Sequence, residues 1–425
     1  MKICLINNLY KPYARGGAET VVETVAGELE KNGHEVFIIA TRPYWGRKKA
    51  EENPPASLRS ATPFNKGANS PQPPLVKGVT TIYLPSLYYN LAQIPLFLRF
   101  FWHIFDVFNK RSYFAIRKIL KKEKPDIVMT HNLKGLGYLI PRAIKKSGIK
   151  WIHTIHDVQL VEPSGVIMSR SSNPPALRAT SFIKEVYMRI CRWLFDSPDR
   201  VVSPSKWLMD FYSEKGFFAK SRKVVMPNPV DIATRNLATR GIATGNLATR
   251  DMEDINFLYL GQIEEHKGVL FLIEVFKKFL NQKSEIKNLK LLIAGPGSKL
   301  EEIKKLAADE PRIKILGRVP HEQIAELLGQ ADFTIVPSLC YENSPTVITE
   351  SFSFGVPVIT ARIGGAAELV REGVNGFIFE AGSEEDLLRA LRLAVEKRND
   401  FKKEEIRKTV EEFGVRKYVE KLLNL

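Results

Sequence analysis

The sequence predicts an α/β protein made of two doubly wound domains, each with a parallel sheet covered by helices on both faces. Short, continuously apolar segments alternate with helical patterns from the first residues onward, as expected for buried parallel strands. The same alternation starts again near residue 255. The chain has 425 residues, of which 44% are hydrophobic and 26% charged, so it can form two globular domains with substantial cores.

The first domain is expected to open with a βαβ unit. The segment 2–7 (KICLIN) predicts a buried strand, and a loop containing Gly16 and Gly17 follows it. Between residues 22 and 29 apolar side chains recur at helical spacing, and Gly33 marks the end of that helix. Further apolar runs predict strands at 35–40, 126–130, 150–155 and 200–205.

Six more apolar runs predict the sheet of the second domain. They lie at 255–261, 289–295, 313–317, 332–338, 356–360 and 376–380, separated by helical or loop sequence. We therefore expect a first domain at 1–225, a connection at 226–254 and a second domain at 255–408. The remaining segment, 409–425, should be a C-terminal helix that packs back on the first domain.

Three segments have the composition of loops. The segment 235–251 repeats the letters NLATR without apolar periodicity, which predicts a flexible insertion with no function of its own. The segments 50–78 and 169–178 are rich in proline and polar residues and indicate loops on the first domain. The first of these follows the carboxyl end of a strand, where loops of such domains contact ligands.

The formal net charge of +16 is concentrated in part in residues 97–124, which carry +6. Phenylalanines recur at helical spacing from Phe97 to Phe108, but the apolar run is too short to span a bilayer. Two interpretations stay open: a helix lying on anionic lipid, or aromatic side chains packed on the domain beside a solvated face of lysines. A nucleic-acid partner is not expected, because no recognition motif accompanies the charge.

The three cysteines, Cys4, Cys191 and Cys340, have no paired spacing, so neither a disulfide framework nor a zinc site is expected. The N-terminal segment reaches charge and glycine after only a few apolar residues, unlike a secretory signal peptide. The sequence therefore favours a reducing, cytoplasmic location, with attachment to the inner membrane face if the segment 97–124 binds lipid.

The segment 342–355 (ENSPTVITESFSFG) predicts an anion site at the start of a helix. Ser344 is a natural N-cap, and Pro345 suits the first helical position because its missing N–H costs nothing there. The following amides and the helix dipole would favour a phosphate. Glu342 should lie just outside the helix and Glu350 about two turns in, where their carboxylates can accept hydrogen bonds from sugar hydroxyls. The other interpretation is an ordinary capped helix with two surface glutamates.

Two further loops contain residues suited to a diphosphate. Lys267 lies in 261–268 (GQIEEHKG), after a strand and before a helix. Gly364 and Gly365 permit close approach of the backbone, and Glu368 follows them. Each signal is weak by itself, since a lone loop lysine is usually solvated and a pair of glycines is common in turns.

Taken in order and spacing, these motifs resemble those of glycosyltransferase family 4. With PYARGGAE (12–19) and MPNPVD (226–231), the resemblance covers nearly the whole chain and is most specific at 255–380, where Glu342 and Glu350 match the family's E-x₇-E motif. It implies the GT-B fold, with two Rossmann-like domains facing across a cleft. It also implies a retaining hexosyltransferase that takes a sugar from a UDP- or GDP-type donor, bound mainly by the second domain. The acceptor, bound mainly by the first, would be a glycan, a lipid-linked sugar or another envelope precursor.

The resemblance assigns the donor-binding roles residue by residue. Lys267 matches the lysine that neutralises the donor diphosphate, Glu342 the residue near the sugar hydroxyls and Glu350 the residue that accepts from the ribose. Gln262 stands where an arginine is usual, which removes a bidentate guanidinium clamp. Ser344 and Pro345 stand where the family often has Phe-Gly. Because Pro345 cannot donate, the amides of Thr346 and Val347 are the expected phosphate contacts, beside Ser344.

In the first domain, Gly16 and Gly17 match a glycine-rich loop that approaches the donor phosphate and the acceptor. His156 matches a histidine that faces the transferred sugar, and His131 ends the neighbouring strand. His156, Lys267 and Glu342 are thus the expected catalytic residues. Retaining transfer implies attack from the leaving-group face, with a diphosphate oxygen taking the acceptor's proton. No metal or other cofactor is expected, and the sequence contains no Asp-x-Asp pair.

The same residues distinguish a transferase from other classes of protein. A sugar-nucleotide epimerase would lack the E-x₇-E motif, and a phosphorylase would need a pyridoxal lysine that the sequence does not identify. A non-catalytic nucleotide-sugar-binding protein of the same fold is favoured only by Gln262 and Pro345. A nicotinamide dehydrogenase would need G-x-G-x-x-G after the first strand, which the sequence lacks.

Overall fold

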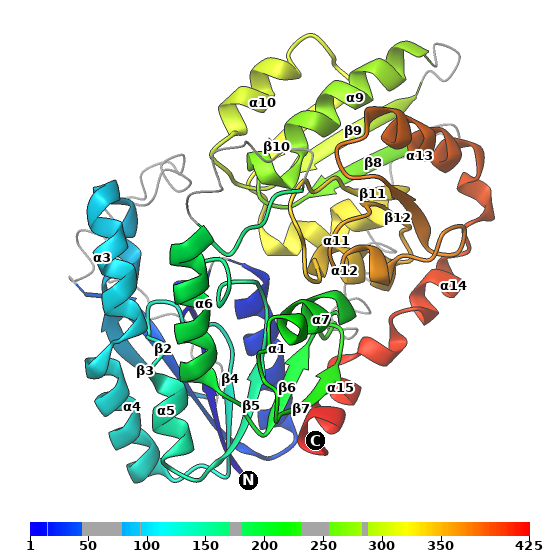
Figure 1. Cartoon of the computed structure of the whole chain (residues 1–425). Coiled ribbons are helices and arrows are strands. Elements are labelled where there is room, and N and C mark those ends of the chain that lie inside the picture. The colour runs from blue at the N-terminus through cyan, green and yellow to red at the C-terminus, as the bar shows by residue number, and fades with distance from the viewer. Residues whose placement is uncertain (15, 45–78, 94, 170–180, 231–254, 283–287) are drawn as a thin grey trace, which may run out of the picture. The chain divides into compact units, whose positions relative to one another are not determined.

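The computed structural model of the chain describes residues 1–14, 16–44, 79–93, 95–169, 181–230, 255–282 and 288–425 (Figure 1). The loop predicted at 50–78, all but residue 169 of the loop predicted at 169–178, and the repeat at 235–251 lie outside the described residues. The chain divides into two compact units: unit 1 falls within Met1–Gly165, Arg178–Pro229 and Tyr418–Leu425, and unit 2 within Val166–Leu177 and Val230–Lys417. The functional domain boundaries stay a prediction.

Unit 1 contains a parallel sheet of seven strands in the order β3-β2-β1-β4-β5-β6-β7 (Figure 1). The strands are β1 (Lys2–Ile6), β2 (Glu35–Pro43), β3 (Thr80–Ser86), β4 (Ile127–Thr130), β5 (Lys150–Thr154), β6 (Arg200–Ser203) and β7 (Arg222–Val225). The sequence predicted the five inner strands and missed the two edge strands, β3 and β7. Because edge strands are covered less completely, these two lack the continuous apolar run by which the others were found.

The helices of unit 1 connect these strands. They are α1 (Gly17–Lys31), the 3₁₀-helix η2 (Leu87–Gln93), α3 (Leu96–Val107), α4 (Lys110–Glu123), α5 (Ile140–Lys145), α6 (Ser181–Phe195) and α7 (Lys206–Glu214). The helix α15 (Val415–Leu423) starts in unit 2 and continues into unit 1, where Arg200 Nε donates to the carbonyl of Leu425 at 2.7 Å.

Unit 2 contains a parallel sheet of six strands in the order β10-β9-β8-β11-β12-β13, and the sequence predicted all six. They are β8 (Ile255–Leu260), β9 (Leu289–Ala294), β10 (Ile313–Gly317), β11 (Phe333–Val336), β12 (Val358–Ala361) and β13 (Gly376–Phe379). The helices are η5 (Glu265–Lys267), α9 (Val269–Gln282), α10 (Leu300–Leu306), α11 (His321–Gln330), α12 (Thr346–Phe354), η6 (Ala367–Leu369), α13 (Glu384–Glu396), η7 (Arg398–Asp400), α14 (Lys403–Lys408) and η8 (Glu411–Phe413). The core includes Phe257 and Phe333, whose stacked rings lie 5.8 Å apart.

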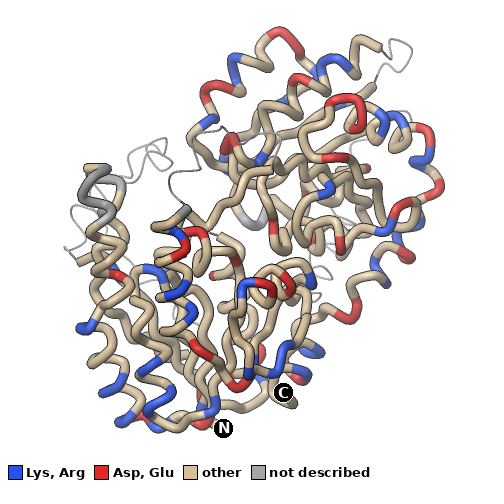
Figure 2. Tube along the Cα trace, in the orientation of Figure 1, with Lys and Arg blue, Asp and Glu red and all other residues tan. Residues whose placement is uncertain are grey.

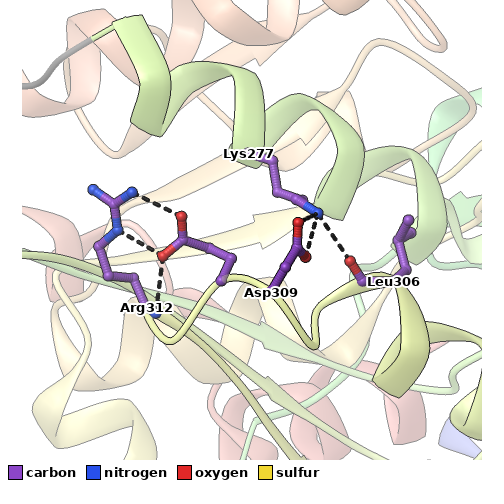
Figure 3. A network of polar contacts seen from close by, with 5 residues as sticks. Lys277, Leu306, Asp309 and Arg312 are labelled. Carbon is purple, nitrogen blue, oxygen red and sulfur yellow. Dashed lines mark hydrogen bonds and ion pairs between the residues drawn. The ribbon is translucent and has the colours of Figure 1, made fainter.

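Polar contacts join α9 to the segment between α10 and β10 (Figure 3). Lys277 Nζ lies 2.6 Å from Asp309 Oδ1 and donates to the carbonyl of Leu306 at 3.2 Å. Glu310 and Arg312 form a two-pronged pair at 2.7 Å beside them. These contacts connect α9 to the segment before β10, and none of the residues that form them is a predicted site residue.

In each sheet the strand order reverses at one place, between β1 and β4 in unit 1 and between β8 and β11 in unit 2. In each sheet the first three strands follow one another toward one edge, and the later strands are added on the other side of the first strand. Loops at the carboxyl ends of such neighbouring strands diverge and leave room for a ligand. The predicted site residues follow β1, β4 and β5 in unit 1, and β8, β11 and β12 in unit 2.

Candidate functional site

In unit 2, the loops that follow β8 and β11 meet through an ion pair. Lys267 Nζ lies 2.6 Å from Glu342 Oε1, and the Ser338 hydroxyl donates to the same oxygen at 2.8 Å. The Lys267 and Glu342 side chains are 24% and 16% exposed. The structure thus brings together two of the three expected catalytic residues, although 74 residues separate them in the sequence.

The environment of Lys267 keeps its ammonium charged. Burial lowers the pKa of Lys267, but the attraction and hydrogen bond of Glu342 outweigh burial, so that the pKa lies above its ordinary value. A positive charge is therefore held in a partly buried place near the end of a parallel sheet. An anionic ligand that reached Lys267 would find this charge already in position.

Backbone contacts fix the position of Glu342. The amide of Gly365 donates to the Glu342 carbonyl at 2.7 Å. Gly364 has φ +61°, and a Cβ there would lie 2.1 Å from that carbonyl oxygen, so only glycine fits without a shift of the loop. The close approach that Gly364 and Gly365 make in the structure is thus to the loop that carries Glu342, and their approach to a diphosphate stays a prediction.

The same loop is held from the other side by residues far earlier in the sequence. The amide of Ser169 donates to the carbonyl of Leu339, and the amide of Tyr341 to the carbonyl of Ile167, both at 2.8 Å. Val166–Ser169 therefore group with unit 2, whereas the sequence predicted residue 169 in a loop of the first domain. A contact between segments so far apart in the sequence cannot be predicted from the residues of either segment alone.

The helix α12 begins later than the sequence predicted. Its N-cap is Pro345 and its first residue is Thr346, so Ser344 precedes the N-cap and does not occupy it. Pro345 has φ −60° and an extended ψ of 119°, which places it before the first turn. Glu350 consequently lies about one turn into the helix rather than two. The first amides, those of Thr346 and Val347, have no partner within the helix because of their place in its first turn.

Gln262 lies in the loop after β8. Its side chain is exposed, and the Tyr259 hydroxyl donates to its main-chain carbonyl at 2.6 Å. The contact fixes the backbone of the loop and leaves the amide side chain facing solvent. Glu350 is half-buried on α12.

In unit 1, Gly16 is the N-cap of α1 and Gly17 its first residue. The amide of Gly16 donates to the carboxylate of Glu19, a residue only 6% exposed. Glu19 thereby satisfies a donor at the place where the resemblance expects approach to a phosphate. Sequence reasoning did not single out Glu19, although its place three residues after Gly16 is that of a capping-box glutamate.

The histidines that follow β4 and β5 lie against each other. His131 Nδ1 is 2.8 Å from His156 Nε2, and the rings stack at 26° with centroids 5.1 Å apart. Burial lowers the pKa of His156 to about 4, and burial followed by repulsion from His156 and His153 lowers the pKa of His131. Both imidazoles are therefore neutral at neutral pH, and the N–H of one ring donates a hydrogen bond to the unprotonated nitrogen of the other.

A small cavity of about 20 Å³, enough for one water molecule, adjoins the histidine pair. Its lining includes Asp157, whose pKa is raised to about 6 by burial and, to a lesser extent, by the negative charge of Glu19. The structure thus places the start of α1 and the ends of β4 and β5 near one another. Sequence reasoning missed Asp157, whose position directly after a candidate histidine was the available signal.

No group of three or more histidine, cysteine, aspartate or glutamate side chains is arranged to hold a metal ion among the described residues. All three cysteines are buried and free. Within the same described residues, no helix is both long and apolar enough to cross a membrane.

Comparison with known proteins agrees with this arrangement. Residues 15–234 match the family model for glycosyltransferase family 4, and residues 248–412 match that for glycosyl transferases group 1. Two parallel α/β units with these matches define a glycosyltransferase of the GT-B fold. The chain belongs to glycosyltransferase family 4, as the sequence motifs predicted.

Several relatives span most of the chain, among them the following two. An uncharacterized 42.6 kDa protein in the cps region of Klebsiella pneumoniae is 26% identical over 391 residues, which cover 89% of this chain and 90% of that protein. A UDP-Gal:alpha-D-GlcNAc-diphosphoundecaprenol alpha-1,3-galactosyltransferase of Escherichia coli is 23% identical over 355 residues, covering 82% and 83%.

Solved structures share the fold at lower identity. A sucrose-phosphate synthase from Thermosynechococcus elongatus superposes with a TM-score of 0.69 at 16% identity, covering 100% of this chain and 98% of that one. The Anabaena protein HepE in complex with UDP superposes with a TM-score of 0.65 at 17% identity, and each chain is covered completely. At these identities the likeness concerns the fold alone.

Proposed function

We propose that this family member is a retaining hexosyltransferase that moves a sugar from a UDP- or GDP-type donor to a glycan or lipid-linked acceptor used in envelope polysaccharide synthesis. The printed name of the Escherichia coli relative describes a UDP-galactose donor and a diphosphoundecaprenol-linked acceptor. The Anabaena structure contains UDP. Both support the general class of substrates, and they leave the individual sugar open.

The observation that carries the proposal is the Lys267–Glu342 pair beside the start of α12. The pair presents a preformed cation, and the first amides of α12 present N–H donors and the positive end of a helix dipole. Together they suit a diphosphate. We assign the phosphate contacts to Lys267, Ser344, Thr346 and Val347.

The carboxylates of the same region suit the uncharged ends of the donor. A donor diphosphate would compete with Glu342 for the ammonium of Lys267, which would leave carboxylate oxygens of Glu342 available to sugar hydroxyls. Glu350, one turn into α12, is assigned to the ribose, since a carboxylate accepts well from a pair of hydroxyls. Gln262 remains a neutral hydrogen-bond donor to the phosphates, weaker than the arginine usual in the family.

Unit 1 is assigned to the acceptor and to the face of the transferred sugar. Gly16 and Gly17 would let the backbone approach the substrates, and His156 would contact the sugar through its imidazole. Because the pKa of His156 is lowered to about 4, that ring acts as a neutral hydrogen-bonding group at neutral pH. We assign it no positive charge in the transition state.

In the proposed reaction, the bond between the anomeric carbon and the diphosphate oxygen breaks and the bond to the acceptor oxygen forms on the same face of the sugar. The acceptor's proton passes to an oxygen of the departing nucleoside diphosphate. The protein stabilises the charge that develops on this diphosphate, through Lys267 and the start of α12, and orients both substrates. The proposal uses no metal and no other cofactor.

Product analysis with a panel of UDP- and GDP-sugars, each with undecaprenyl-diphosphate-linked sugar acceptors, tests the proposal. We expect a glycosylated lipid whose new linkage keeps the anomeric configuration of the donor, determined by NMR coupling constants. Inversion would contradict the retaining mechanism. Conversion of the donor alone would favour an epimerase-like protein, and donor binding without turnover by any acceptor would favour the non-catalytic alternative.

The proposed site of action is the cytoplasmic face of the inner membrane. Nucleotide sugars are the assigned donors, and lipid-linked sugars lie in the bilayer surface, so an enzyme that joins them works at that boundary. Fractionation of cells between soluble and membrane pools, with and without a salt wash, tests this location.

A further inference from the structure

Four helices of unit 1 form one layer on one face of the seven-stranded sheet. The chain passes from β3 to β4, from β4 to β5 and from β5 to β6 in the same direction across the sheet, so right-handed crossovers put α3, α4, α5 and α6 on the same side. The helix α4 packs against α5, and α5 packs against α6 (Figure 1). The outward side of this helical layer carries an unusual set of side chains.

The outward face of α3 is aromatic and exposed. Phe105 is 75% exposed, and Phe101, Ile104 and Phe108 are exposed beside it, as is Phe114 at the start of α4. The opposite face of α3 is anchored in the unit, because Trp102 and Asp106 are buried and the amide of Gly135 donates to both carboxylate oxygens of Asp106 at 2.9 Å. The exposed aromatic side chains therefore belong to a firmly held helix.

The helix α6 carries a second exposed apolar stripe. Phe182 and Val186 are four residues apart, Trp193 follows two turns later, and Ile183 lies beside them; Phe182 is 78% and Trp193 62% exposed. The guanidinium of Arg142 on α5 stacks over the Trp193 ring at 4.3 Å. A tryptophan with an arginine beside it is an arrangement suited to the boundary between lipid tails and headgroups.

The same layer is strongly basic (Figure 2). The helix α4 contains Lys110, Arg111, Arg117, Lys118, Lys121 and Lys122, against one acidic residue, Glu123, which pairs with Lys2 at 2.9 Å. Within the part of the chain that the structure describes, no carboxylate pairs with Lys110, Arg117, Lys118 or Lys121. These four cations of α4 are thus available to an anionic partner, and Lys122, which lies 3.3 Å from its chain neighbour Glu123, is still 81% exposed.

We propose that the outward face of α3, α4 and α6 docks the enzyme on an anionic phospholipid bilayer. The aromatic side chains of α3 and α6 would insert at the level of the headgroups, and the lysines and arginines of α4 would contact lipid phosphates. A bilayer fits both features, because it presents apolar chains under a negatively charged surface. Docking does not depend on sugar transfer, and each can fail without the other.

The charge contribution is tested by sedimentation of the full chain with vesicles of phosphatidylcholine containing phosphatidylglycerol. A triple variant, Lys118→Glu with Lys121→Glu and Lys122→Glu, should bind these vesicles at least about a hundredfold more weakly than the wild type. Each lysine close to an anionic surface strengthens binding to it, and each glutamate in its place is repelled. The matched control reverses Lys305, Lys314 and Lys402, exposed lysines of unit 2, and changes the net charge equally. The control should bind like the wild type, and wild-type binding should fall steeply as salt is raised.

The apolar contribution is tested by tryptophan fluorescence and by substitution of exposed aromatic side chains. Vesicles should shift the wild-type emission to the blue, and most of the shift should be lost in Trp193→Phe. Among the described tryptophans Trp193 is the exposed one, whereas Trp102 and Trp151 are buried and Trp207 is half-buried. The variant Phe105→Ser with Phe182→Ser should bind vesicles at least about tenfold more weakly, with an unchanged unfolding midpoint.

Three outcomes overturn the proposal. Equal binding of the charge-reversed variant and its control to anionic vesicles would show that α4 makes no lipid contact. Unchanged binding of the Phe105→Ser, Phe182→Ser variant would show that the aromatic residues remain in water. Self-association of the full chain that the same substitutions abolish, without any vesicle binding, would assign the face to a second copy of the protein instead.

Discussion

Lys267 and Glu342 form a partly buried ion pair, with 2.6 Å between Nζ and Oε1. An ammonium in this position is already desolvated in part, so a diphosphate gains its attraction without a large reorganisation of the protein. Glu342 holds the Lys267 side chain in one position and keeps its ammonium charged, unlike a solvated lysine in a loop.

The substitution Lys267→Ala should therefore lower sugar transfer by orders of magnitude and leave the fold intact. The missing cation removes charge stabilisation of the leaving diphosphate, an effect of about 3 kcal/mol or more on the barrier. Initial rates on the intact donor, with circular dichroism as a check on folding, measure this. Lys278→Ala is the matched control, because Lys278 also forms an ion pair, at 2.7 Å to Glu384, but on the exposed side of α9. Equal rates in the two variants would remove Lys267 from the site.

The histidine pair predicts how stability depends on pH. The pKa of His156 is about 4 in the folded chain, whereas an unfolded histidine titrates near 6.5. Between these values the unfolded chain binds a proton that the folded chain does not, so the free energy of unfolding decreases as the pH falls through this range. Asp157 has the opposite effect on the free energy of unfolding. Because its pKa is raised to about 6 in the folded chain, its protonation stabilises that chain as the pH falls.

Comparison of His156→Asn with the wild type isolates the histidine. We expect the wild type to lose roughly 2 kcal/mol more than the variant between pH 7.5 and pH 5, measured by urea unfolding at both values. The same loss in both proteins would mean that His156 is charged or well solvated in the folded state.

At the scale of elements, the loop after β12 sets the position of the loop after β11. Gly364→Ala would bring a Cβ within 2.1 Å of the Glu342 carbonyl and must displace one of the two loops. Gly373→Ala is the matched control, since Gly373 also has a positive φ, +73°, but its Cβ would meet nothing within 4 Å. Both variants place an alanine at positive φ, which should destabilise the folded chain by on the order of 1 kcal/mol. Only Gly364→Ala should also displace the loop that carries Glu342.

We expect Gly364→Ala to weaken binding of UDP or GDP at least tenfold while Gly373→Ala binds like the wild type. Calorimetric titration measures the affinities, and thermal unfolding gives the cost of each variant to stability. Equal affinities would show that the contact between these two loops has no part in holding the nucleotide.

Elements buried on both faces could be predicted from the sequence, and elements defined by distant partners could not. The inner strands of both sheets have continuous apolar runs, whereas β3 and β7 lie at the sheet edges and lack them. The start of α12 was placed too early because Ser344 and Pro345 have the composition of a helix start while the backbone turns helical only at Thr346.

The same distinction applies to the site. The roles expected of Lys267, Glu342 and His156 stay predictions, and they came from the motifs that resemble the family. The Lys267–Glu342 and His131–His156 contacts did not, because they depend on which strands become neighbours in the sheet. Nor did the contribution of Val166–Ser169 to the loop of Glu342, which joins segments about 170 residues apart.

At the scale of the whole molecule, we propose that unit 2 binds the nucleotide and that two of its carboxylates contact different parts of the donor. Glu350, on α12, should contact the ribose whatever sugar is attached, and Glu342, in the loop before α12, should contact the sugar. The two residues therefore separate binding of the nucleotide from transfer of the sugar.

Calorimetric titration of bare UDP and GDP into the full-length wild type, Glu350→Gln and Glu342→Gln, paired with transfer rates on the intact donor, tests this division most directly. The account predicts that Glu350→Gln weakens binding of the preferred nucleotide by roughly 1 to 3 kcal/mol, the scale of a lost charge-assisted hydrogen bond. Glu342→Gln should keep nearly the wild-type affinity for the nucleotide and transfer sugar far more slowly. Loss of nucleotide affinity in Glu342→Gln with none in Glu350→Gln would reverse the two roles, and no binding of either nucleotide by the wild type would contradict the account as a whole.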